Sequence, residues 1–214
     1  MEQGKKIVII GAGGFGREVL WLIERINEKK FSWRVAGFID DAMECNDTVN
    51  QIPVLGSLKK LEMQQEEIDV VCAIGSAKIR RNVIERLKKN SKLHFPNLID
   101  PCVFYSHDIK MGEGNIICAG TILTTNITLG DFNILNLNCT VGHDVEIKSF
   151  VTVYPGTNIS GNVRVGAESE LGTGAKIIQG KQIGNQVIVG AGAVVVADLI
   201  EAGTYIGVPA KPLL

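Results

Sequence analysis

The residue type best suited to proton transfer is scarce in this chain, which contains three histidines. One of them, His143, is followed directly by Asp144 in the segment CTVGHD (139–144). A neutral imidazole can take a proton from an attacking amine or hydroxyl, and an adjacent carboxylate can orient the ring and raise its basicity. His143 and Asp144 are therefore the predicted catalytic pair. His94 falls in an expected strand and His107 precedes the regular repeat, so both are predicted to be structural.

A second chemical signal is the glycine-rich segment GAGGFG (11–16), which matches G-x-G-x-x-G. It follows the apolar run KKIVII (5–10) and precedes an amphipathic segment (17–30), as a strand–turn–helix unit requires. Gly11 permits the tight turn, and Gly13 lets a phosphate approach the backbone at the helix N-terminus. A tight turn that packs helix on strand without any ligand remains the alternative.

Further short strands and helices follow this turn. The run RVAGFI (34–39) ends in Asp40 and Asp41, which can accept hydrogen bonds from a ribose hydroxyl or a base, or serve only as a strand end and helix cap. A strand at 69–74 ends at Gly75 and precedes a helix at 77–89, and shorter extended pieces are expected at 52–55 and 93–99. Residues 1–100 are thus predicted to form a small Rossmann-like α/β domain. Its ligand is expected at the carboxyl ends of the strands, near Gly13, Asp40 and Gly75.

The catalytic pair lies in a strict six-residue repeat. From Met111 to Val195 every sixth residue is aliphatic, fifteen positions in succession. Helices and ordinary strands have periods of about 3.6 and 2, whereas a hexapeptide period is typical of a parallel β-helix. Three hexads per coil predict about five coils, beginning near Val103, in a second domain of residues 101–214 that ends in a tail.

An 18-residue coil also predicts which residues are neighbours of His143. Thr125 lies one coil before it and Gly161 one coil after it. A glycine beside an outward histidine leaves space for a substrate and leaves the Gly161 N–H accessible as a donor. Asn136, just upstream, can supply a further hydrogen bond.

Composition limits the class of protein. The chain has 214 residues, a net charge of -1 and five cysteines. This charge balance does not indicate binding to nucleic acid or to an anionic membrane surface. An odd number of scattered cysteines without C-x-x-C favours a reducing cytoplasm and buried thiols, Cys139 included, over disulfides or a zinc site. The sequence predicts no signal peptide, and no apolar run approaches the roughly 18–20 residues that span a bilayer.

Taken together, these motifs resemble a known family. GAGGFG, FIDD, AIG before a basic helix, the hexapeptide repeats, GHD and the terminal GVPAKPL resemble the NeuD/PglD-type bacterial sugar O-/N-acyltransferases over nearly the whole chain. The resemblance implies a left-handed β-helix and a homotrimer, with acetyl-CoA in the groove between neighbouring β-helices and no metal. It also implies a nucleotide-linked amino sugar as the substrate and a role in surface glycan synthesis.

The resemblance assigns roles to individual residues. His143 matches the general base and Asp144 its acidic support, while Gly161 matches the glycine whose N–H holds the thioester oxygen. The residues that match nucleotide-sugar contacts are Gly13, Gly14, Phe15, Asp40, Asp41, Gly75 and Asn136. Those that match the acetyl-CoA site are Thr152, Gly161, Thr173 and Ala191.

Two positions depart from the family pattern. Thr152 stands where a second histidine often contacts acetyl-CoA, nine residues after the catalytic one, and a threonine can still donate a hydrogen bond there. Phe15 stands where many members have a histidine in the glycine turn, which bears on the choice of sugar.

The leading hypothesis is therefore an acetyl-CoA-dependent acetyltransferase acting on the amine of a UDP-4-amino-sugar. The alternative is an O-acetyltransferase acting on sialic acid or another sugar. A dinucleotide-binding protein is less favoured, because the α/β domain is short and no residue suits hydride chemistry. A zinc enzyme of the γ-carbonic anhydrase kind needs three converging histidines. A non-catalytic scaffold would leave His143 and the glycine turn unexplained.

Overall fold

The computed structural model describes residues 4–213 and divides into two compact units. The first consists of the chain up to Gly75 together with Ile79–Pro101. The second consists of Ser76–Lys78 together with Cys102 onwards. The first unit ends at Pro101 in the structure, and the sequence predicts a domain boundary after residue 100. Each unit is described by itself below.

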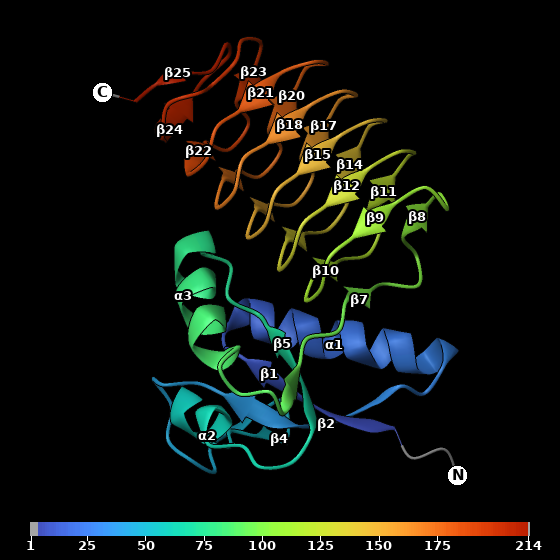
Figure 1. Cartoon of the computed structure of the whole chain (residues 1–214), viewed down its shortest axis with the longest axis vertical. Coiled ribbons are helices and arrows are strands. Elements are labelled where there is room, and N and C mark those ends of the chain that lie inside the picture. The colour runs from blue at the N-terminus through green and yellow to red at the C-terminus, as the bar shows by residue number, and fades with distance from the viewer. Residues whose placement is uncertain (1–3, 214) are drawn as a thin grey trace. The chain divides into compact units, whose positions relative to one another are not determined.

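The first unit is built on a parallel sheet with the strand order β2-β1-β5-β6. Its strands are β1 (Lys5–Ile10), β2 (Trp33–Ile39), β5 (Ile68–Cys72) and β6 (Leu93–His94). The helices are α1 (Gly14–Lys29), α2 (Leu58–Glu62) and, from Ile79 onwards, α3 (Ala77–Leu87), as labelled in Figure 1. β3 (Thr48–Val49) and β4 (Ile52–Pro53) form an antiparallel hairpin, and β7 (Leu98–Ile99) follows β6.

Three predicted elements differ in detail. Helix α1 begins at Gly14, inside the glycine motif, and not at residue 17. The segment 52–55 is extended as expected but divided: Ile52–Pro53 form one arm of the hairpin, and Val54 pairs in parallel with Phe38 of β2. The stretch 93–99 is divided into β6 and β7 on either side of Pro96, because proline has no N–H to offer a strand ladder.

The core of the first unit explains why β1 is a continuous apolar run. Its last four residues, from Ile7 to Ile10, are all buried, as expected for a parallel strand covered on both faces. The glycine motif brings α1 close to this strand: a Cβ on Gly16 would lie 1.9 Å from the carbonyl oxygen of Gly11. The closing segment is tied to α1 by the ion pair between Arg25 and Asp100, whose carboxylate is buried.

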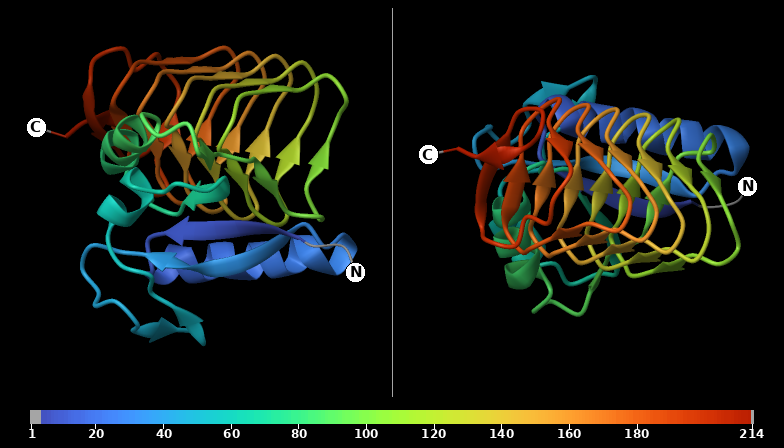
Figure 2. Two further views of the ribbon diagram at one scale, coloured as in Figure 1. Left: turned by 60° about the horizontal axis from the view of Figure 1, so that its bottom comes forward. Right: turned by 90° about the horizontal axis from the view of Figure 1, so that it is seen from above.

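The second unit is a β-helix with three sides, each a row of short parallel strands (Figure 2). The first side contains β10 (Ile116–Ile117), β13 (Ile134–Leu135), β16 (Thr152–Val153), β19 (Glu170–Leu171), β22 (Val187–Val189), β24 (Gly203–Ile206) and the antiparallel β25 (Lys211–Pro212). The second contains β8 (Phe104–Tyr105), β11 (Ile122–Leu123), β14 (Thr140–Val141), β17 (Asn158–Ile159), β20 (Lys176–Ile177) and β23 (Val194–Val195). The third contains β9 (Lys110–Met111), β12 (Thr128–Leu129), β15 (Glu146–Ile147), β18 (Arg164–Val165) and β21 (Gln182–Ile183).

The six-residue ladder fills the interior, so the predicted fold class is confirmed. Strand partners are 18 residues apart, as in the pairing of Val141 with Leu123 and Ile159. The ladder residues after Met111 are buried, and none exceeds the 3% exposure of Ile183. Each buried aliphatic side chain contributes about 1.5–3 kcal/mol of transfer free energy, so the repeat supplies the core of this unit.

A second six-residue pattern marks the corners of the coils. From Gly114 to Gly192, every sixth residue has a positive φ, three places after each ladder residue. Glycine, asparagine and aspartate tolerate this left-handed conformation, and Asp144 adopts it with φ 60°. Two phenylalanines, Phe132 and Phe150, also adopt it, and their rings stack at 5.4 Å. The corners thus turn the chain sharply between one side of the coil and the next.

No helix among residues 4–213 is both long enough and apolar enough to cross a membrane.

Candidate active site

His143 and Asp144 lie on the corner between the second and third sides, between β14 and β15. His143 Nδ1 lies 2.8 Å from Asp144 Oδ2, and about half of each side chain is exposed. The hydrogen bond to His143 lowers the pKa of Asp144, and a second one from Asn126 lowers it further. The carboxylate therefore remains ionised and favours the tautomer with the proton on Nδ1, which leaves Nε2 as the acceptor.

Gly161 lies next to the imidazole, as the stacking of coils predicts. A Cβ placed on Gly161 would lie 2.4 Å from His143 Nε2 and 2.6 Å from Cε1. The ring therefore occupies space that only a glycine leaves open. Within residues 4–213, the N–H of Gly161 donates no hydrogen bond. His143 Nε2 and the Gly161 residue whose N–H is unused thus lie next to each other, an arrangement that suits a base and an oxyanion donor.

Other predicted site residues lie on a different corner, between the first and second sides. Thr173 and Ala191 are exposed on this corner. Asn136 lies on the same corner but is buried, and its Oδ1 accepts a hydrogen bond from the Leu137 N–H at 2.7 Å. Gly174 and Gly192, which follow Thr173 and Ala191, have open space where a Cβ would project. A single copy of this β-helix therefore does not bring these residues to His143.

Thr152 lies in β16 on the first side and is only 1% exposed. A side chain so buried offers almost no open surface to a ligand in this structure. Its contact with acetyl-CoA stays a prediction.

The glycine turn of the first unit has the features of an anion site. Gly13 is the N-cap of α1, no side chain caps this end, and the first turn carries no acidic residue. Gly13 and Gly14 are exposed, and a Cβ on Gly13 would meet no atom within 4 Å. The free N–H groups of the helix end can therefore be approached by a phosphate. Phe15 is half-buried in the same turn.

The acidic residues beside this turn already hold backbone groups. Asp40 accepts hydrogen bonds from the N–H groups of Ala12 and Ala42, each at 2.9 Å. Asp41 accepts one at 2.8 Å from the N–H of Leu58, the first residue of α2, and so acts as a helix cap. A carboxylate oxygen can accept more than one hydrogen bond, so Asp40 and Asp41 can still accept one from a ligand hydroxyl.

At Gly75 the structure reveals a residue that the sequence did not single out. Arg80 is 1% exposed, and its Nη1 donates to the carbonyl oxygens of Ile74 at 2.7 Å and Gly75 at 2.9 Å. This buried guanidinium holds the loop that follows β5. Among the basic residues of α3 it had no distinguishing sequence signal, because only the packing shows which one points inward.

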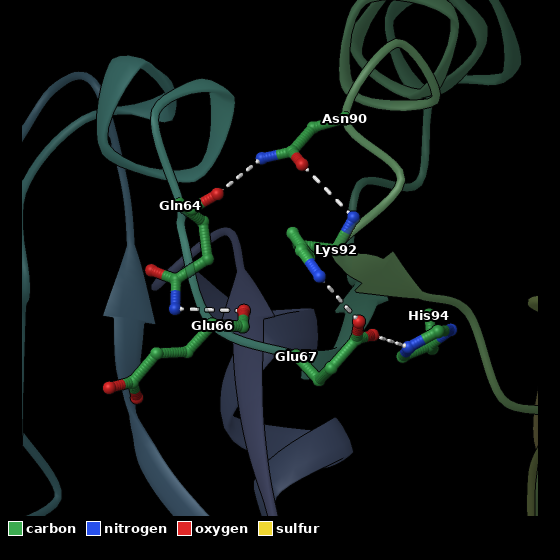
Figure 3. A network of polar contacts seen from close by, with 6 residues as sticks. All are labelled: Gln64, Glu66, Glu67, Asn90, Lys92 and His94. Carbon is green, nitrogen blue, oxygen red and sulfur yellow. Dashed lines mark hydrogen bonds and ion pairs between the residues drawn. The ribbon is translucent and has the colours of Figure 1, made fainter.

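His94 lies at the amino ends of the sheet strands, opposite to the glycine turn. It contacts Glu67, which also accepts a hydrogen bond from Lys92 Nζ at 3.0 Å (Figure 3). The hydrogen bond from Lys92, followed by that from His94, lowers the pKa of Glu67. His94 is thus a member of an exposed polar network.

The prediction that His107 precedes the regular coils is wrong. It lies between β8 and β9, and β8 is paired with β11. His107 therefore belongs to the first coil and lies on the same corner as His143, two coils earlier. In this coil the position that continues the six-residue ladder is occupied by Tyr105, which is 56% exposed and not aliphatic. The aliphatic ladder therefore does not reveal this coil.

The thiol of Cys139 fits a passive role. Burial raises the pKa of Cys139 to about 11, in agreement with the predicted inert thiol. Among residues 4–213, no three His, Cys, Asp or Glu side chains form a group that could hold a metal ion.

Comparison with known proteins identifies the family. Residues 6–87 match the family model of the PglD N-terminal domain. GDP-perosamine N-acetyltransferase of Escherichia coli O157:H7 is 31% identical over 189 residues, which are 86% of this chain and 82% of that protein. The chain belongs to the NeuD/PglD-type family of sugar acyltransferases. The predicted family and enzyme class are thereby confirmed.

Two solved structures support this membership. The acetyltransferase domain of PglB from Neisseria gonorrhoeae FA1090, in complex with acetyl coenzyme A, is similar with a TM-score of 0.87 and 33% identity, over 99% of this chain and 100% of that one. PerB from Caulobacter crescentus, in complex with CoA and GDP-perosamine, is similar with a TM-score of 0.88 and 31% identity, over 100% of this chain and 98% of that one. Both likenesses extend over the α/β unit and the β-helix.

Proposed function

We propose that this acyltransferase transfers the acetyl group of acetyl-CoA to the amine of a nucleotide-linked amino-deoxy sugar, with His143 as general base. The observation that carries the proposal is His143 Nε2, held beside Gly161 by the contact between Nδ1 and Asp144. The relatives support it, because they include N-acetyltransferases of GDP-perosamine and structures with acetyl-CoA or CoA bound.

His143 Nε2 takes a proton from the sugar nitrogen as that nitrogen forms a bond to the thioester carbonyl carbon. The Gly161 N–H donates to the oxygen on which negative charge then develops, and Asp144 stabilises the imidazolium. When the carbon–sulfur bond breaks, the imidazolium returns its proton to the sulfur. CoA leaves as the thiol, the sugar nitrogen becomes an amide, and His143 is neutral again.

The nucleotide is proposed to bind at the glycine turn, with its phosphates against the exposed N–H groups near Gly13 and Gly14. Phe15, Asp40, Asp41 and Gly75 are the proposed surroundings of the sugar nucleotide, and Asn136 stays a predicted substrate contact. A UDP-4-amino-4,6-dideoxy sugar is the proposed acceptor, and the relatives named above make the GDP counterpart its nearest rival. We place the reaction in the cytoplasm, as a step of surface glycan synthesis.

Thiol release from acetyl-CoA tests this proposal directly. The acceptors to compare are a UDP-4-amino-4,6-dideoxy sugar, its GDP counterpart, the matching hydroxyl sugar nucleotide and free sialic acid. We expect release with an amino-sugar nucleotide and none with the hydroxyl compounds. Release with free sialic acid alone would contradict both the amine acceptor and the nucleotide site at the glycine turn.

The acetyl-CoA site is proposed to lie between two copies of the chain in a homotrimer. His143 and Gly161 lie on one corner of the coil, whereas Thr173 and Ala191 lie on another, with a strand of the second side between them. If neighbouring β-helices pack side by side, the corner with His143 and Gly161 in one copy can face the corner with Thr173 and Ala191 in the next. Acetyl-CoA would then contact Gly161 from one copy and Thr173 and Ala191 from its neighbour, with Thr152 retained as a predicted contact.

A mixed trimer distinguishes a shared site from one within a single copy. His143→Ala removes the base and Ala191→Trp fills the exposed groove position, so each variant alone is expected to be inactive. If sites are shared, co-expression of the two variants is expected to restore about a quarter of the wild-type activity, because mixed trimers contain one site with both native corners. The same two proteins mixed after separate folding are the control. No recovery on co-expression, with trimers confirmed by mass, would refute the shared site.

A further inference from the structure

The support of the catalytic pair extends one coil further back, to Asn126. Asn126 and Asp144 are 18 residues apart and occupy equivalent corner positions, with φ values of 55° and 60°. The Asp144 N–H donates to the Thr125 carbonyl oxygen at 3.1 Å, which stacks the two corners on each other. The two side chains therefore project from the same corner in the same direction.

The carboxylate of Asp144 is held at both of its oxygens. Asn126 Nδ2 donates to Asp144 Oδ1 at 3.3 Å, while Asp144 Oδ2 lies 2.8 Å from His143 Nδ1. A carboxylate bonded at a single oxygen can rotate about its Cβ–Cγ bond and take the imidazole with it. The second bond opposes that rotation, and the imidazole position matters because Nε2 lies beside Gly161.

The structure assigns Asn126 as a positioning residue that acts on His143 through Asp144. This inference rests on the proposed function of His143 as general base. Within residues 4–213, the side-chain hydrogen bond of Asn126 goes to Asp144 and not to the imidazole.

An asparagine meets three requirements at this corner. Its backbone tolerates the positive φ, its amide is a donor, and it is uncharged. An aspartate would keep the shape but place a second carboxylate against Asp144, and like charges at that distance destabilise the ionised form. The next coil lacks this arrangement: Asn162 has φ 56°, but its side chain makes no hydrogen bond within residues 4–213.

The test uses Asn126→Gly, with Asn162→Gly as its matched control. Glycine preserves the corner conformation in both variants and removes only the side chain. The backbone bond from Asn162 N–H to the His143 carbonyl oxygen, at 2.8 Å, survives in the control. For Asn126→Gly we expect kcat to fall about five- to tenfold, the size of one lost hydrogen bond to a charged group near solvent, with KM for both substrates unchanged. Asn126→Asp is expected to lose at least as much, and Asn162→Gly to keep the wild-type kcat.

A double variant separates positioning from a general structural effect. In an Asp144→Gly background, Asn126→Gly is expected to cause no further loss of kcat, because the residue through which it acts is absent. An additional five- to tenfold loss there, or a wild-type kcat in the single variant, would overturn the inference. Either of these two results could occur while His143→Ala is inactive, so they would overturn the role of Asn126 and leave the proposed function intact. An active His143→Ala enzyme would instead overturn the proposed function itself.

Discussion

Replacing His143 by alanine is expected to lower kcat for acetyl transfer by about 10²–10⁴-fold, the usual contribution of a general base. The physical reason is that no other side chain on this corner combines an accepting nitrogen with the position beside Gly161. The half-exposed ring contributes little to the core, so the unfolding temperature is expected to remain close to that of the wild type.

Steady-state kinetics with an amino-sugar nucleotide and acetyl-CoA, together with thermal unfolding, measure this effect. His94→Ala is the control, because it also removes an exposed histidine but at the amino ends of the α/β sheet, where Glu67 is its contact. The control is expected to retain wild-type kcat. Full activity of His143→Ala in a folded protein would remove the assignment of the base.

Replacing Gly161 by alanine is expected to have the second largest effect, a loss of about 100-fold in kcat, the penalty of displacing a catalytic group by about 1 Å. The added Cβ would lie 2.4 Å from His143 Nε2, so the ring must move from its position. Because the ring is half exposed, it can rotate toward solvent, and the free energy of unfolding is expected to fall by less than about 1 kcal/mol.

The same substitution in a His143→Ala background isolates this steric contact. The three atoms closest to the added Cβ all belong to the imidazole, so removing the ring removes the closest contacts of the methyl group. Gly161→Ala is then expected to reduce kcat much less than in the wild type, and what remains measures any effect on the Gly161 N–H. An equal loss in both backgrounds would show that the collision with His143 is not the cause.

The regular parts of this protein could be predicted because their causes are local or periodic. The aliphatic residues from Met111 to Val195 recur at six residues, and the interior of a coil is the only place where such a period buries every member. The position of Gly161 next to His143 followed from the same period, because three six-residue repeats make an 18-residue coil. The strand–turn–helix at GAGGFG was predictable because glycine is required where Gly16 packs against the carbonyl oxygen of Gly11.

Where the period is hidden or packing decides, the sequence was less informative. Because Tyr105 is not aliphatic, the six-residue ladder does not show the first coil. His107 was therefore predicted to precede the repeat, although it lies on the same corner as His143. Asp40 and Asp41 were predicted either as ligand contacts or as a strand end and helix cap, and only the structure shows them bonded to the N–H groups of Ala12, Ala42 and Leu58.

The sequence by itself determined the class of each unit, the coil length, and the positions of the candidate pair His143–Asp144 and its glycine neighbour, because hydrophobic period and residue type specify these. Only the tertiary structure decided which corner each residue occupies, that Thr152 is buried, that Arg80 points inward and that Asn126 reaches Asp144. These features depend on side-chain directions and on contacts between residues far apart in sequence. Three-dimensional packing decides which partner a side chain contacts, and the identity of the residue alone does not specify that partner.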